Sequence, residues 1–169
     1  MKIRGFTLPE LLVAMAISAM LLALAAPGFS RRRGEAALRS ASSQTLVVLQ
    51  LARREALARG QSVTACPTRD GIVCSFGARQ WMLFANGPAG TNARRDPADE
   101  VLQTWTLPQG VSVSGTRGYA AFQPRPGAAI TVTFDFCHRA APRSVAIVVS
   151  QTGRPRIERG TAAGSCPGN

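Results

Sequence analysis

The fold is decided by the stretch GFTLPELLVAMAI at residues 5–17, which continues to Phe29 without another charge after Glu10. A helix over residues 6–29, at about 1.5 Å per residue, would be about 36 Å long. That length is sufficient to cross the hydrocarbon core of a bilayer. We therefore predict a membrane anchor over residues 6–29.

Glu10 is the one charge inside this apolar stretch. An ionised carboxylate in lipid is costly unless it is paired or protonated, so Glu10 needs a cation at the same depth. A new amino terminus made by cutting after Gly5 would supply one, from the same chain or a neighbouring one. The alternative is a Glu10 side chain that reaches back to the lipid headgroups.

The residues before Phe6 favour the first interpretation. Lys2 and Arg4 form a positive stub that ends at Gly5. A secretory signal peptide has its small-residue cleavage site after the apolar region, whereas the evident site here lies before it.

This arrangement resembles the type III leader of type IV pilins and type II secretion pseudopilins. The resemblance implies that a prepilin peptidase cuts between Gly5 and Phe6, that Phe6 is then N-methylated, and that Glu10 directs assembly with other subunits. It also implies a bacterial inner-membrane protein with one membrane span, its N-terminus in the cytoplasm and its domain in the periplasm, which joins a pilus or pseudopilus. Pro9 falls in the first turn of the predicted helix, where proline is tolerated.

The whole chain has 169 residues, with 20 Lys and Arg against 9 Asp and Glu. Removal of Lys2 and Arg4 with the leader takes the net charge from +11 to +9. Arg31, Arg32 and Arg33 follow the predicted anchor directly, where they would contact anionic headgroups or form a solvated turn of helix.

Residues 30–60 change from uniformly apolar to amphipathic. A stripe at spacings of three or four predicts a helix that buries one face, consisting of Leu38, Ala41, Thr45, Leu49, Ala52 and Ala56. Gly60 is a natural C-terminal stop. We expect one long helix of about 50 residues, packed through this stripe on a sheet.

Beyond Gly60 the apolar period falls to two, which is typical of strands separated by Gly, Pro, Asn and Asp. The predicted strands are 63–66, 80–85, 101–107, 111–113, 119–122, 130–136 and 144–150. The fold class is therefore α+β, in which a cleaved leader (1–5), an assembly helix (6–29) and an amphipathic helix (30–60) precede an antiparallel β-domain (61–169).

Four cysteines indicate an exported, oxidised domain, and they allow three pairings. We favour Cys66 with Cys74, which closes a small loop, and Cys137 with Cys166, which would tie down the C-terminal tail. Zinc is the competing interpretation, but the sequence holds no C-x-x-C and one histidine, His138.

Catalytic motifs give little support to an enzyme. Cys137 and His138 are adjacent, so on a strand they point to opposite faces and cannot act as a nucleophile and its base. No phosphate-binding glycine loop, metalloprotease motif or nucleophile elbow occurs. We expect no cofactor, no metal and no catalytic residue, and a structural role for His138.

The segment TGRPRIERG at residues 152–160 is the most informative part of the β-domain. From Val101 onward the chain has two acidic residues and a local excess of +5, carried by Arg117, Arg125, Arg139, Arg143, Arg154, Arg156 and Arg159. Such a cluster suits a polyanion such as DNA. The alternative is a charged edge strand that prevents aggregation. Four aromatic residues would stack on bases if exposed, although their patterns favour core packing: Trp81, Trp105, Tyr119 and Phe122.

Together, the long helix, small β-domain, paired C-terminal cysteines and G-R-x-R turn resemble the GspH/FimT family of minor pilins and pseudopilins. In FimT-like members this turn is implicated in DNA binding during natural transformation, and the matching positions are Gly153, Arg154 and Arg156. The resemblance, together with the basic surface, predicts a non-specific DNA site made of Arg154, Arg156, Arg159, Arg143 and Arg139. The alternative is a GspH-like minor subunit of the type II secretion pseudopilus.

Overall fold

The computed structural model describes residues 7–87, 90–125 and 127–162, and for residues 22–27, 159 and 161–162 it describes the backbone alone. Within these residues, one helix, α1 (Leu8–Arg59), precedes eight strands. The strands are β1 (Val63–Pro67), β2 (Gln80–Ala85), β3 (Glu100–Thr106), β4 (Val111–Gly115), β5 (Ala120–Phe122), β6 (Val132–His138), β7 (Arg143–Val149) and β8 (Pro155–Ala162).

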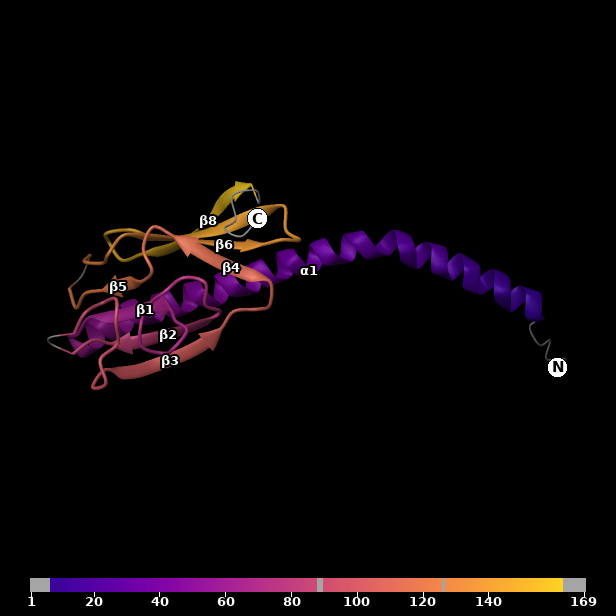
Figure 1. Cartoon of the computed structure of the whole chain (residues 1–169). Coiled ribbons are helices and arrows are strands. Elements are labelled where there is room, and N and C mark those ends of the chain that lie inside the picture. Colours follow the sequence, from indigo (N-terminus) through magenta and orange to yellow (C-terminus); the bar gives the residue numbers. More distant parts are fainter. Residues whose placement is uncertain (1–6, 88–89, 126, 163–169) are drawn as a thin grey trace, which may run out of the picture.

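The helix α1 has two halves with different surroundings (Figure 1). Its N-terminal half projects from the domain, and large apolar side chains such as Leu12, Ile17 and Met20 are exposed there. Within the part whose side chains the structure describes, no helical stretch is long and apolar enough to cross a membrane. The predicted anchor also contains Phe6 and residues 22–27, which lie outside that part.

The C-terminal half of α1 confirms the predicted amphipathic stripe. Its six positions are all buried, with exposures of 0–2% for Leu38, Ala41, Thr45, Leu49, Ala52 and Ala56. The helix ends at Gly60, whose φ of 66° is the left-handed conformation that glycine adopts without strain. The 52-residue element is therefore the single long helix expected from the sequence.

The β-domain consists of two antiparallel four-stranded sheets, with orders β3-β2-β1-β5 and β4-β6-β7-β8. Both sheets contact the C-terminal half of α1. The core between them is aromatic: the ring of Trp81 lies 5.3 Å from that of Trp105 and 5.2 Å from that of Phe134, centroid to centroid. Trp81, Trp105 and Phe122 are buried and Tyr119 is half-buried, so core packing is the confirmed interpretation of these aromatics.

All seven predicted strands are present within two residues of their expected ends, and an eighth strand was missed. β8 pairs antiparallel with β7 and forms the edge of the second sheet. Its sequence, PRIERGTA, does not predict a strand, because it begins with proline, contains glycine and lacks a regular apolar alternation. An edge strand tolerates such a sequence, since one of its two sides needs no partner strand.

The predicted disulfide between Cys66 and Cys74 is present, with a Cα–Cα distance of 5.5 Å. These two sulfurs are bonded to each other and are therefore not metal ligands. Cys137 lies on β6, but Cys166 lies outside the described residues, so the pairing of Cys137 with Cys166 stays a prediction.

Candidate functional site

The turn between β7 and β8 carries the glycine and first arginine of the G-R-x-R motif. Gly153 has a φ of 70°, and its amide donates a hydrogen bond to the Ser150 carbonyl at 2.8 Å. This left-handed conformation favours glycine. A Cβ at Gly153 would lie 3.7 Å from Nε of Arg53, so the turn sits directly against α1.

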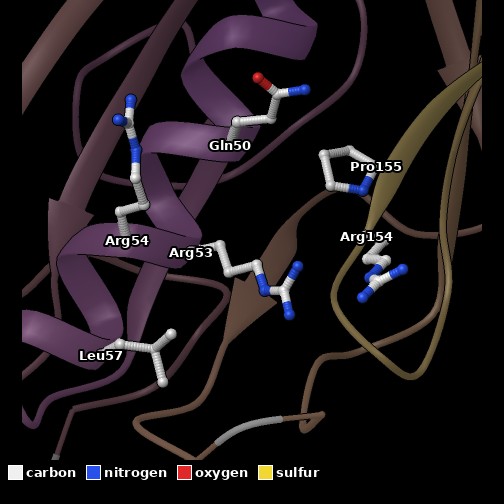
Figure 2. A pocket seen from close by; sticks show the side chains of 6 residues that line it. All are labelled: Gln50, Arg53, Arg54, Leu57, Arg154 and Pro155. Atoms are coloured by element: carbon white, nitrogen blue, oxygen red, sulfur yellow. The ribbon is translucent and has the colours of Figure 1, made fainter.

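An open groove of about 580 Å³ separates this turn from the end of α1. Its lining residues are Gln50, Arg53, Arg54, Leu57, Arg154 and Pro155. Figure 2 shows the side chains of Arg53 and Arg154 extending toward the same space from the helix and from the turn. We call this the turn groove.

The turn groove concentrates positive charge. It is lined by three arginines and, among the described residues, by no carboxylate. Within that part of the chain, Arg53, Arg54 and Arg154 also form no ion pair. Arg125 and Arg53 both line a small hollow beside the same turn, so a fourth arginine lies close by.

Arg59, near the end of α1, shows the contrasting case. Its guanidinium pairs with Glu55 at 2.7 Å and with Glu100 at 2.6 Å. Hydrogen bonds from Arg59 to Glu55 and to Glu100 raise the pKa of its guanidinium above the ordinary value. The positive charge of Arg59 is therefore balanced by two carboxylates, whereas the arginines of the turn groove can bind an anionic ligand.

The structure divides the five arginines that the sequence placed in one site. Arg154 lines the turn groove, but Arg156 pairs with Glu158. In register, Pro155 and Ile157 lie opposite the buried Val149 and Ile147, so Arg156 and Glu158 point to the other face of the sheet. For Arg159 the structure describes the backbone alone.

Arg143 and Arg139 lie at the opposite end of the same sheet. Arg143 begins β7, and the six steps to Val149 correspond to about 20 Å of strand. Arg139 is on the turn between β6 and β7. The structure therefore places these two arginines apart from Arg154, because a hairpin brings its two strands together but separates their ends.

A second groove of about 520 Å³ lies at that opposite end. Its lining is mixed in charge and largely apolar, and comprises Glu35, Leu38, Arg39, Pro142, Arg143, Ser144, Val145, Ile157 and Glu158. We call this the mixed groove. Two glutamates offset its two arginines, which makes it a poorer site for a polyanion.

Sequence reasoning missed Arg53 and Arg54, which lie off the buried stripe of the helix. A signal was available. Neither arginine has an acidic residue three or four positions away in either direction, whereas Arg59 has Glu55 and Arg39 has Glu35. Unpaired arginines on the exposed side of a helix are candidates for binding an external anion.

At the N-terminus, Gly5 and Phe6 lie outside the described residues, so the cleavage and methylation sites stay predictions. Glu10 is described. Its Oε2 accepts hydrogen bonds from the Thr7 amide at 3.4 Å and the Thr7 hydroxyl at 3.3 Å. Thr7-x-x-Glu10 is a helix-start motif that the sequence analysis did not name.

Comparison with known proteins gives a consistent result. Residues 41–153 match the family model described as "Type II transport protein GspH", and residues 1–26 match the "Prokaryotic N-terminal methylation motif". The chain is 35% identical over 167 residues to pilin-like protein PilA1 of Thermus thermophilus, covering 92% of this chain and 98% of that protein.

Two solved structures share the fold at low sequence identity. The type IV minor pilin FimU of Pseudomonas aeruginosa matches with a TM-score of 0.57 at 17% identity, covering 75% of this chain and 94% of FimU. The minor pseudopilin EpsH of Vibrio cholerae matches with a TM-score of 0.52 at 14% identity, covering 72% and 96%. Together with the family match over residues 41–153, these findings identify the chain as a member of the GspH family of pilin-type subunits, which are structural proteins and not enzymes.

Proposed function

We propose that this pilin-type subunit binds DNA without sequence preference through the turn groove. The observation that carries the proposal is the grouping of Arg53, Arg54 and Arg154 around one open groove that, among the described residues, contains no carboxylate. Guanidinium groups form paired hydrogen bonds with phosphate oxygens, and such charge-assisted bonds are stronger than neutral ones.

The position of the groove supports a ligand that arrives from outside the cell envelope. Arg53 and Arg54 lie near the C-terminal end of α1, at the opposite end of the helix from Leu8 (Figure 1). If the N-terminal half is held in a membrane or in the filament core, the turn groove faces away from it.

Three or four phosphates would be engaged, by the three groove arginines and Arg125. Each phosphate contact releases condensed counterions, so we expect log K to fall with log salt at a slope of about −3 to −4 for duplex DNA. Uptake of DNA in natural transformation is the process that such a surface would serve.

The experiment is a salt series of DNA affinity, with the full chain in a nonionic detergent. We compare the wild type with Arg154→Gln/Arg156→Gln and with a control, Arg69→Gln/Arg94→Gln, that removes two exposed positive charges outside the groove. The proposal expects a steep salt dependence and a marked loss in the first variant alone. If the wild type does not bind DNA at low salt, the proposal is wrong.

The N-terminal segment is proposed to act as it does in other chains with this motif. Prepilin peptidase would cut after Gly5, Phe6 would be N-methylated, and residues 6–29 would hold the subunit in the bacterial inner membrane, with the domain in the periplasm, before assembly with other subunits. The new amino group would precede Thr7, which already contacts Glu10 through its amide and hydroxyl.

This account predicts a separation of two phenotypes in Glu10→Ala. Leader cleavage should remain, because the cut lies five residues before Glu10 in the sequence, whereas incorporation into filaments should fall sharply. Immunoblots of cleaved protein and of sheared filaments measure the two steps. Normal incorporation of Glu10→Ala would contradict the assigned role of this carboxylate.

A second candidate function is favoured by the GspH family match: a minor pseudopilin of the type II secretion system. That subunit would contact other minor subunits and would need no DNA site. Deletion of the gene separates the two, since loss of protein secretion with unchanged transformation would support the secretion role, and the reverse would support DNA uptake.

A further inference from the structure

Four arginines gather where α1 enters the β-domain, outside the turn groove. They are Arg31, Arg32 and Arg33 on α1 and Arg139 on the turn between β6 and β7, and all four are exposed. We propose that this basic rim binds the headgroups of acidic phospholipids and holds the domain against the membrane surface before assembly. The proposal rests on the membrane anchoring of residues 6–29 proposed above.

Helix length sets the depth of the rim. Residues 11–30 are twenty uncharged positions between Glu10 and Arg31. At about 1.5 Å per residue this distance is about 30 Å, the thickness of the hydrocarbon core. Because the proposed anchor over residues 6–29 spans this core, Arg31 to Arg33 follow it directly at the level of the opposite headgroups.

The local contacts leave the rim positive. Arg31 donates a hydrogen bond to Glu35 at 3.0 Å, but Glu35 is also 3.9 Å from Arg39 and is shared between them. Arg33 lies over the ring of Phe29, with its guanidinium carbon 5.5 Å from the centroid. The face of an aromatic ring attracts a cation through the ring's quadrupole, so this contact keeps the full charge of Arg33.

The β-domain brings the fourth arginine to the same level. A Cβ added at Gly34 would lie 2.7 Å from Nδ1 of His138 and 3.1 Å from Cβ of Ala140. The turn that carries Arg139 therefore packs directly against the helix, one residue beyond Arg33. Nδ1 of His138 also accepts a hydrogen bond from the Ala140 amide at 3.1 Å, which fixes this turn.

Charge and geometry together select the class of lipid. Successive helical residues are about 100° apart, so Arg31, Arg32 and Arg33 spread around the helix and reach headgroups on more than one side. With Glu35 subtracted from Arg31, Arg32 and Arg33, the helical part of the rim carries a net charge of +2. Acidic headgroups such as phosphatidylglycerol carry a net negative charge, whereas phosphatidylcholine is neutral overall, so the rim should prefer the former.

The test reconstitutes the full chain in phosphatidylcholine vesicles that contain spin-labelled phosphatidylglycerol or spin-labelled phosphatidylcholine. Electron spin resonance gives the association constant of each lipid with the protein. We expect several-fold selectivity for phosphatidylglycerol, since one arginine near an anionic surface contributes about fivefold in binding. The selectivity should disappear in 1 M salt because the Debye length is then about 3 Å.

Two variants make the test specific. Arg31→Gln/Arg32→Gln/Arg33→Gln should lose the selectivity, and the same three positions changed to lysine should retain it. The matched control Arg53→Gln/Arg54→Gln/Arg154→Gln removes the same charge from the turn groove and should leave the selectivity unchanged.

The outcomes separate this inference from the proposal on which it rests. If motionally restricted lipid is present but shows no preference for phosphatidylglycerol, the basic rim is not a lipid site, and the anchor stands. If no restricted lipid is found for the wild type, residues 6–29 do not insert, and both the anchor and the rim are wrong.

Discussion

The turn groove and the mixed groove lie at opposite ends of the β7–β8 hairpin, and each is lined by α1 on one side. The turn groove has three arginines and, among the described residues, no acidic partner. The mixed groove has two arginines and two glutamates around an apolar floor. Both ends of the hairpin are rich in arginine in the sequence, but only the turn groove has a clear excess of positive charge in the structure.

The difference shows that the helix, rather than the arginine-rich turn, decides which end can bind a polyanion. Near the turn, α1 contributes Arg53 and Arg54. Near the other end it contributes Glu35 together with Arg39, which lie 3.9 Å apart. The same turn sequence packed on a different part of α1 would be a weaker site.

The largest expected effect is a loss of DNA affinity on charge reversal. Arg53→Glu/Arg154→Glu should weaken binding about a hundredfold, since two charge-assisted hydrogen bonds are worth about 3 kcal/mol together. Arg39→Glu/Arg143→Glu makes the same change in net charge in the mixed groove and should cost far less. Equal losses in fluorescence anisotropy titrations would show that overall charge alone governs binding.

A smaller effect on stability should distinguish the two ends of β8. Gly160 approaches the backbone of Ser144, where an added Cβ would lie 2.9 Å from the carbonyl carbon and oxygen. Gly160→Ala should therefore destabilise the fold by about 1–3 kcal/mol, measured by thermal unfolding. Its DNA affinity at a temperature where it is folded should match the wild type, because Gly160 lies away from the turn groove.

Gly153→Ala is the counterpart at the other end. Its φ of 70° makes alanine strained by about 1 kcal/mol, which corresponds to a fall of about 3 °C in Tm. Here DNA affinity should fall as well, because the strained turn no longer holds Arg154 beside Arg53. A variant that loses stability and keeps full affinity would separate the turn from the binding site.

The two arginines of the G-R-x-R motif should not contribute equally. Arg154→Gln should reduce DNA affinity about tenfold, the effect of one charge-assisted contact. Arg156→Gln should have a smaller effect, since Arg156 is paired with Glu158 on the other face of the sheet. A larger effect of Arg156→Gln would show that DNA binds at the outer face of β8 and not in the turn groove.

The smallest effect is expected away from both grooves, in the loop closed by Cys66 and Cys74. Hydrogen bonds from the amides of Val73 and Ile72, together with the Thr68 hydroxyl, lower the pKa of Asp70 below its ordinary value of 3.8. The charged form is thus favoured by folding, so its stabilisation is present above pH 3.8 and is lost as the pH falls through the lowered pKa.

The protection factors of the Ile72 and Val73 amides, which correct for the intrinsic pH dependence of exchange, should therefore fall in acid in the wild type. In Asp70→Asn they should be low already at neutral pH, while DNA affinity stays unchanged. Unchanged protection of these amides in Asp70→Asn would show that the disulfide alone holds the loop.

Much of this fold could be predicted from the sequence because the signals are local. The stripe from Leu38 to Ala56 and the end at Gly60 depend on helical spacing, and the alternation around Phe134 depends on strand geometry. The edge strand β8 was missed because it forms through hydrogen bonds to β7, and its own residues carry no strand pattern.

The candidate site was harder to predict than the fold. Arg154 was identified because it follows a turn glycine. Its partners Arg53 and Arg54 lie about 100 residues earlier in the chain, and only the packing of the turn on α1 brings them together. The separation of Arg143 from Arg154 has two causes. The length of β7 was predicted from the sequence, but the pairing of β7 with β8 was not.

The central claim is that α1 completes the DNA site at one end only, and the salt dependence of DNA affinity for Arg53→Gln and Arg39→Gln tests it most directly. Both variants remove one exposed or half-buried arginine from the same helix. The account predicts that Arg53→Gln weakens binding and makes the slope of log K against log salt less steep by about one, while Arg39→Gln leaves it unchanged. An unchanged slope in Arg53→Gln, or an equal change in both, would contradict the claim.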